Sequence, residues 1–169
     1  MKNLAKFFVV ILVLTTTALN AQNQEKFGHI DFGLLYSMMP GLDSVKAKYD
    51  QYAKTLQNQF DAMQNELQSK VMDYQSNQAT MSAIIKQTKE KEIQDLQARI
   101  DAFQNSAQQD LQDKETELSQ PLIDKAREAV KQVAKENGYT YILNTSGGMV
   151  IYADPGDDIM DLVKKKLGI

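Results

Sequence analysis

The sequence predicts an α+β fold in which a small β-rich association body carries a long protruding antiparallel α-helical coiled-coil hairpin. Apolar residues recur at helical spacing through the middle of the chain, which has no proline or glycine from Asp43 to about Gln75. Short strand-like runs, bounded by turn residues, lie on either side of this stretch. We therefore expect residues 43–119 to form the helical arm, and residues 22–42 and 120–169 to form the body.

Residues 1–21 have the layout of a secretory signal peptide. Lys2 and Lys6 precede a short apolar run and a small-residue exit, and the run is too short to span a bilayer. We expect cleavage after Ala18 or Ala21, and therefore an exported protein.

The remaining chain is acidic and has no cysteine. Without the two lysines of the leader it contains 17 basic and 22 acidic residues, a formal charge of −5. This balance gives no electrostatic reason to expect nucleic-acid binding. The absence of cysteine excludes disulfides and thiolate metal sites, so stability must come from packing or assembly.

The first half of the arm has one narrow apolar stripe with an 11-residue repeat. Three helical turns hold about 10.8 residues, so this period keeps the stripe nearly straight along the helix. A stripe this narrow suits a single helical partner. We expect Asp43 or Ser44 to cap the helix start. The stripe consists of Val45, Tyr49, Tyr52, Leu56, Phe60, Met63, Leu67, Val71 and Tyr74.

The second half of the arm is predicted to fold back across a turn at residues 76–81. It starts near Ser82, and at about 1.5 Å per residue the hairpin should project roughly 50 Å. Pro121 is expected to kink the returning helix or to begin a new segment, and we hypothesise that it is a hinge that lets the arm spread. The facing stripe is Ile93, Leu96, Ile100, Phe103, Ala107, Leu111 and Leu118.

The body is predicted from a strand at 27–32, a helical turn at 33–39, a β-hairpin formed by 139–144 and 149–152, and a last helix at 157–167. Three short strands without a disulfide make a marginal domain with open edges, so we expect a homo-oligomer. The residues expected in the core and in subunit contacts are Phe27, Ile30, Phe32, Leu34, Leu35, Tyr141, Leu143, Val150 and Tyr152.

Residues that would support catalysis are sparse. His29 is the only histidine, and Gly147-Gly148 lacks the Lys-Ser/Thr that follows the glycines of a phosphate-binding loop. The acidic run at 154–158 lacks the ligand spacing of an EF-hand, and a turn with a helix cap explains it better. We therefore expect no enzyme, no cofactor and no metal site.

The order of these elements resembles the Skp (OmpH) family of periplasmic chaperones. The segments that carry the resemblance are 27–36, 138–144, 149–152 and 157–167, with the long hairpin between the first two. The resemblance implies a homotrimer with three arms around a cavity, located in the periplasm. It also implies an ATP-independent holdase that binds unfolded outer-membrane β-barrel proteins and prevents their aggregation.

Four apolar residues near the predicted arm tip, Met72, Met81, Ile84 and Ile85, are candidates for client binding. They could equally seal the tip of the hairpin. From Lys70 to Lys91 there are four lysines and two acidic residues, so the tip could make only a weak contact with a membrane surface. Two other functions stay open: an envelope structural coiled-coil adaptor or spacer that binds one folded partner, and an accessory subunit of an enzyme.

Overall fold

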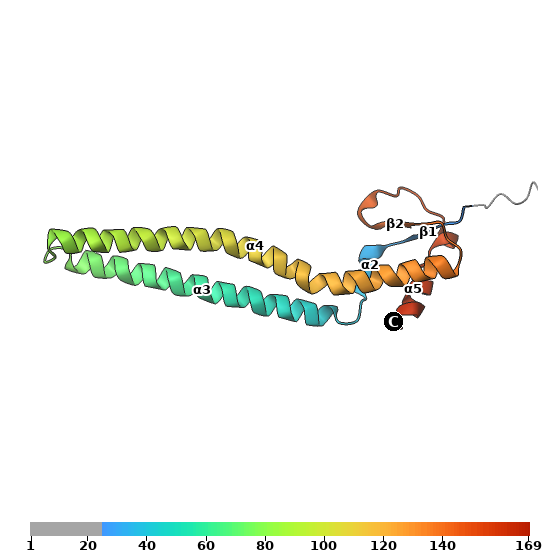
Figure 1. Cartoon of the computed structure of the whole chain (residues 1–169), viewed down its shortest axis with the longest axis horizontal. Coiled ribbons are helices and arrows are strands. Elements are labelled where there is room, and N and C mark those ends of the chain that lie inside the picture. The colour runs from blue at the N-terminus through green and yellow to red at the C-terminus, as the bar shows by residue number, and fades with distance from the viewer. Residues whose placement is uncertain (1–24) are drawn as a thin grey trace, which may run out of the picture.

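A computed structural model describes residues 25–169 and shows an elongated molecule, with a compact body at one end and a two-helix arm at the other (Figure 1). The predicted fold class is confirmed. The predicted signal peptide, with its two cleavage sites, lies outside the described residues.

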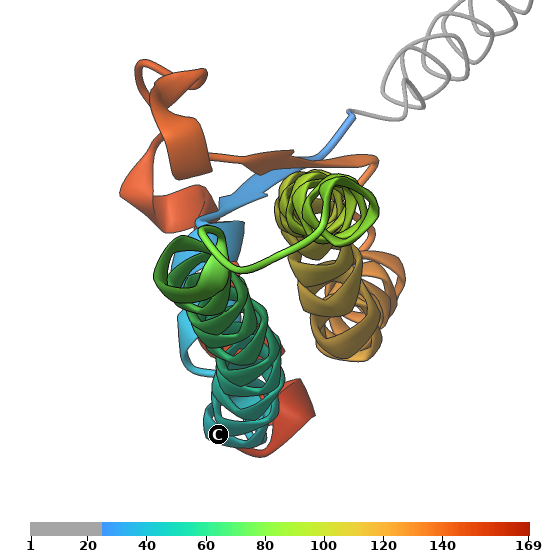
Figure 2. The ribbon, with the colours of Figure 1, turned by 90° about the vertical axis from the view of Figure 1, so that its left-hand side faces the viewer.

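The arm consists of α3 (Leu42–Asn77) and α4 (Ala83–Glu136), which run side by side (Figures 1 and 2). Every predicted stripe position on both helices is buried or half-buried, and the deepest are Leu56, Leu96 and Ile100. At about 1.5 Å per residue, the 36 residues of α3 span about 54 Å. The periodicity therefore predicted both the pairing and the length.

The two arm helices start differently. Ser82 caps α4, because its side chain accepts a hydrogen bond from the amide of Ile85. The predicted caps of α3, Asp43 and Ser44, are wrong. Gly41 occupies the N-cap position with a φ of 96°, a left-handed conformation that favours glycine, and the chain reverses there so that the helix begins directly at Leu42.

Pro121 lies inside α4, so the expectation that a new segment begins there is wrong. Since proline has no amide hydrogen, the carbonyl of Glu117 has no helical donor at this point. The ribbon of α4 changes direction between the arm and the body (Figure 1). The hinge stays a prediction.

The body contains a two-stranded parallel sheet. Strand β1 (Phe27–Ile30) pairs with β2 (Tyr141–Asn144), with Phe27 opposite Tyr141. Parallel strands need a long crossover connection. Here α2 (Phe32–Ser37) and the whole arm form that crossover, so the sheet joins the two ends of the arm.

The predicted β-hairpin is wrong, because Met149–Tyr152 is not a strand. The turn exists as the short 3-10 helix η1 (Ser146–Gly148), but the chain leaves the sheet after it. Asn144 explains this direction: its side-chain oxygen accepts from the amide of Phe32 at 3.1 Å and from the amide and hydroxyl of Ser146 at 3.0 and 2.8 Å. These bonds tie the end of β2 to the start of α2.

The last helix, α5 (Met160–Leu167), begins later than predicted because residues Pro155–Asp157 form a second 3-10 turn, η2. It packs on α4 and closes a core to which five parts of the body contribute. Of the predicted body residues, Ile30 and Leu35 belong to this core and Phe32 packs against it. The buried members are Ile30, Leu35, Met39, Ala126, Ala129, Val133, Ile159 and Val163.

Candidate functional site

The tip of the arm is held together by polar contacts between its two helices. Lys70 pairs with Glu92 at 3.0 Å, and Lys89 pairs with Asp73 at 2.7 Å. Next to the Lys89–Asp73 pair, the Tyr74 hydroxyl donates a hydrogen bond to Glu90. These contacts fix the end of α3 against the start of α4.

The same contacts shift the protonation of the groups involved. The hydrogen bond and positive charge of Lys89 lower the pKa of Asp73, and Asp73 in turn raises the pKa of Lys89. The hydrogen bond to Glu90 raises the pKa of Tyr74. These groups are half-buried or exposed and remain open to solvent, so each ion pair contributes little to stability.

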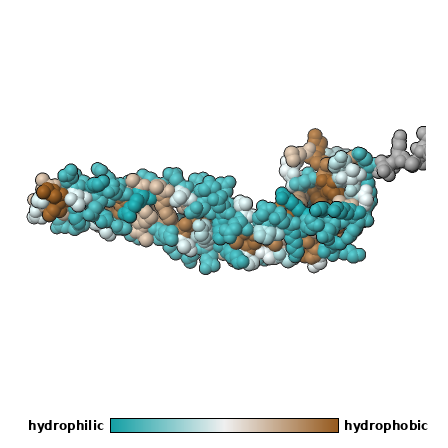
Figure 3. All heavy atoms as spheres, viewed as in Figure 1, coloured by the Kyte–Doolittle hydropathy of each residue, from teal (hydrophilic) through white to brown (hydrophobic). Residues whose placement is uncertain are grey.

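The four candidate apolar residues at the tip differ in their surroundings. Met72, Ile84 and Ile85 are exposed by 54%, 77% and 49%, whereas Met81 is half-buried in the turn. Sealing the hairpin therefore does not account for the first three side chains. Hydrophobic residues gather at the arm end, and smaller apolar patches lie along the mainly hydrophilic remainder of the arm (Figure 3).

The positive charge of the tip is largely paired. Lys70 and Lys89 contact acidic residues of the opposite helix, and Lys91 pairs with Asp95 at 3.4 Å. Exposed ion pairs of this kind reduce the field available to an anionic surface. A strong electrostatic contact between the tip and lipid is therefore not expected.

The body presents a second apolar surface. Phe27 and Tyr141 are exposed by about half and stack on each other with ring centroids 5.6 Å apart. Leu34, Leu143 and Tyr152 are also exposed, whereas Val150 is half-buried. Sequence reasoning missed two neighbours, Met149 and Ile151, which are exposed by 84% and 99%. The apolar character of the whole 149–152 run was the available signal.

Within residues 25–169, no three or more His, Asp or Glu side chains are grouped so that they could hold a metal ion. His29 has a structural contact, because its Nε2 lies 2.9 Å from the carbonyl oxygen of Asp154 and so links β1 to η2. No helix in the described part of the chain is both long and apolar enough to cross a membrane.

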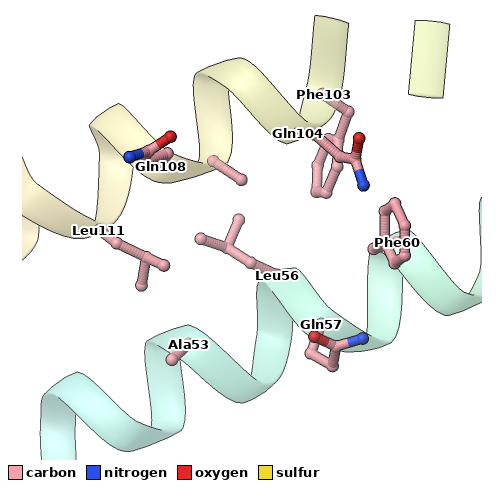
Figure 4. Close-up of a pocket in the computed structure, with 9 residues that line it drawn as sticks. Ala53, Leu56, Gln57, Phe60, Phe103, Gln104, Gln108 and Leu111 are labelled. Atoms are coloured by element: carbon pink, nitrogen blue, oxygen red, sulfur yellow. The ribbon is translucent and has the colours of Figure 1, made fainter. Parts of the chain in front are cut away.

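A groove halfway along the arm was also missed by sequence reasoning. It lies between α3 and α4 and has a volume of about 360 Å³. Figure 4 shows Leu56 and Phe60 of α3 facing Phe103 and Leu111 of α4 across it. The stripe predicted contact at these positions, and spacing alone could not show that the side chains leave a gap.

The fold and these surfaces define a binding protein whose two-helix arm projects from a small body. The chain belongs to the family described as "Outer membrane protein (OmpH-like)", whose model matches residues 26–167. It is similar to the Chaperone protein Skp of Pectobacterium atrosepticum, with 23% identity over 91% of this chain and 92% of the relative. It is also 25% identical to the Chaperone protein Skp of Photorhabdus laumondii, over 89% and 90% of the two chains.

A solved structure of an OmpH-like protein from Caulobacter crescentus CB15 has the same fold. The TM-score is 0.65 at 15% identity, and the match covers 87% of this chain and 86% of that one. The family is one of chaperones and not a class of enzymes.

Proposed function

We propose that this protein is an ATP-independent holdase that binds unfolded outer-membrane β-barrel proteins in the periplasm and prevents their aggregation. One observation carries the proposal: the arm is a thin helix pair with exposed apolar side chains at its tip and an apolar groove halfway along it. Binding an unfolded chain lowers its free concentration, so aggregation slows without nucleotide hydrolysis.

Several copies of the arm would act together. Weak contacts from separate arms add through effective concentration, while each contact can release quickly. The body offers a surface for such assembly in Tyr152 and Ile151, which protrude, and in an apolar cleft of about 370 Å³ whose lining includes Ile30 and Ile142. A contact in which one copy's protrusion meets the next copy's body is head-to-tail, and it generates a closed ring when the rotation between copies closes. We propose a homotrimer.

The unpaired 149–152 run fits this assembly. It has the composition of a strand and yet pairs with nothing in the described chain, and an exposed apolar strand is stabilised by a second chain. Ile151→Asp should therefore shift the molar mass in solution towards that of one chain. Leu162→Asp, at a 41% exposed position of α5, is the matched control and should leave the mass unchanged.

The holdase is tested by diluting a urea-unfolded outer-membrane β-barrel protein into buffer and following light scattering. At near-stoichiometric amounts and without ATP, this protein should suppress the rise for several unrelated barrel proteins. Failure to suppress any of them, together with capture of one folded envelope protein, would instead identify an adaptor or spacer.

A further inference from the structure

The groove between α3 and α4 has a lining without a charged side chain. Its lining combines two alanines, Ala53 and Ala107, with larger apolar side chains and three glutamines. Ala107 occupies a stripe position and Ala53 directly follows one, and their small side chains leave space that a leucine would fill. The lining residues are Ala53, Leu56, Gln57, Phe60, Phe103, Gln104, Ala107, Gln108 and Leu111.

The uncharged stretches of the two helices coincide at this groove. Residues 55–60 of α3 and 102–109 of α4 contain no Lys, Arg, Asp or Glu, and both stretches line the groove. Lys54 and Asp61 flank the first stretch, and Asp101 and Asp110 flank the second. The uncharged lining on both helices favours a neutral occupant. A charged group placed among these side chains would lose hydration, and the lining offers no opposite charge to pair with it.

Glutamines at the edge of the groove suit a polypeptide backbone. Gln57, Gln104 and Gln108 each have a carboxamide, which is both donor and acceptor. The Gln57 amide nitrogen donates to Asp61 at 2.8 Å, which leaves its carbonyl oxygen to accept. Figure 4 shows Gln57 and Gln104 on opposite helices with the apolar side chains between them. An extended chain presents N–H and C=O groups along its edge and alternates its side chains. One of its side chains can then enter the apolar floor while its backbone bonds to the amides.

The size of the groove limits what can enter. A volume of about 360 Å³ is at the small end of ligand sites, which span roughly 300–1,000 Å³. It accommodates one or two large side chains and not a folded surface. We propose that the mid-arm groove binds an extended, uncharged segment of an unfolded polypeptide, taking up its apolar side chains one or two at a time. This inference rests on the proposed function and assigns it a site distinct from the arm tip.

The test is to fill the groove from inside. Ala107→Leu and Ala53→Leu add bulk to its floor, while Ala98→Leu and Ala62→Leu make the same change at exposed positions of the same helices. The probe is a fluorescent 12-residue peptide in which Val and Tyr alternate with Thr and Gln. Groove filling should weaken binding at least tenfold, and the controls should stay within twofold of the original protein. Equal binding by all four variants would overturn the inference.

A second measurement covers the case in which a groove variant disturbs the hairpin. A photo-crosslinking side chain is placed at Gln104 in the otherwise unchanged protein, and separately at Gln109, two residues after Ala107 and so about 200° around α4 from it. An unfolded barrel protein should crosslink strongly at Gln104 and at least fivefold less at Gln109. Equal crosslinking, or crosslinks from Gln104 to a second copy of this chain, would contradict the proposal.

These outcomes separate the groove from the holdase. If the unmodified protein suppresses aggregation and the groove variants do so equally well, the groove proposal fails and the holdase stands. If the unmodified protein suppresses nothing, the proposed function itself fails.

Discussion

The arm and the body bury their apolar side chains in different ways, and α4 belongs to both regions. In the arm, Leu96 and Ile100 of α4 are buried against a single helix, α3, whose one buried residue is Leu56. In the body, the same helix contributes Ala126, Ala129 and Val133 to a core built from several elements. The comparison teaches that the body is stabilised by contacts among several elements, whereas the arm is stabilised by one pair of apolar stripes. The arm can therefore open locally while the body stays folded.

The largest effect is expected from a cavity in the body. Ile159 is fully buried, so Ile159→Ala should lower the free energy of unfolding by about 2–5 kcal/mol. The same change at Ile84, which is 77% exposed, should alter it by less than about 0.5 kcal/mol. Urea denaturation measures both, and equal losses would remove the distinction between the two regions.

A cavity in the arm should act locally. Leu96 is 1% exposed and lies on the apolar stripe of α4, so Leu96→Ala should cost about 2 kcal/mol, a low value because the two helices can approach each other. Amide hydrogen exchange should accelerate in α3 and in the arm part of α4, with α5 unchanged. Faster exchange throughout α5 would show that arm and body unfold as one unit.

Pro121→Ala tests the joint between the regions. The substitution restores one helical hydrogen bond, to the carbonyl of Glu117, and should raise the free energy of unfolding by about 1 kcal/mol. If Pro121 is a hinge, the distribution of distances between spin labels on the arm and the body should also narrow. Unchanged arm mobility, together with an unchanged size range of bound clients, would refute the hinge.

The smallest effect is expected at the exposed ion pairs of the tip. The pKa of Asp73 is lowered in the folded protein from its ordinary 3.8, so its contribution is present above that value and is lost as the pH falls through the folded pKa. Lys89→Met should move the Asp73 pKa back up, as measured by NMR titration of the carboxyl carbon. An unchanged pKa would show that Lys89 does not hold this carboxylate in solution.

The sequence predicted the arm far better than the body, for a physical reason. The apolar residues of the arm stripe, such as Tyr49, Leu56 and Phe60, recur at short sequence separations. Their spacing determines both the helix and the face that it buries. The partner of β2 is instead decided more than a hundred residues away, at Phe27 to Ile30, so the local alternation in 149–152 suggested the wrong hairpin. The hydrogen bonds of Asn144 that redirect the chain connect segments distant in sequence.

The functional surfaces divide in the same way. Met72, Ile84 and Ile85 were predicted from sequence as client-binding candidates because they lie off the stripe. The structure shows that they are exposed, and their role in binding stays a prediction. The mid-arm groove depends on the distance between the two helices at Ala53 and Ala107, and periodicity does not give that distance. Its available signal was the missing charge in 55–60 and 102–109.

The central claim is that the body assembles copies of the chain and that the arms hold an unfolded protein. The most direct test is light scattering, which measures the molar mass in solution with and without a urea-unfolded barrel protein. We predict the mass of three chains alone, and after mixing the mass of three chains plus one barrel protein. The mass of a single chain, or an unchanged mass while the barrel protein aggregates, would contradict this.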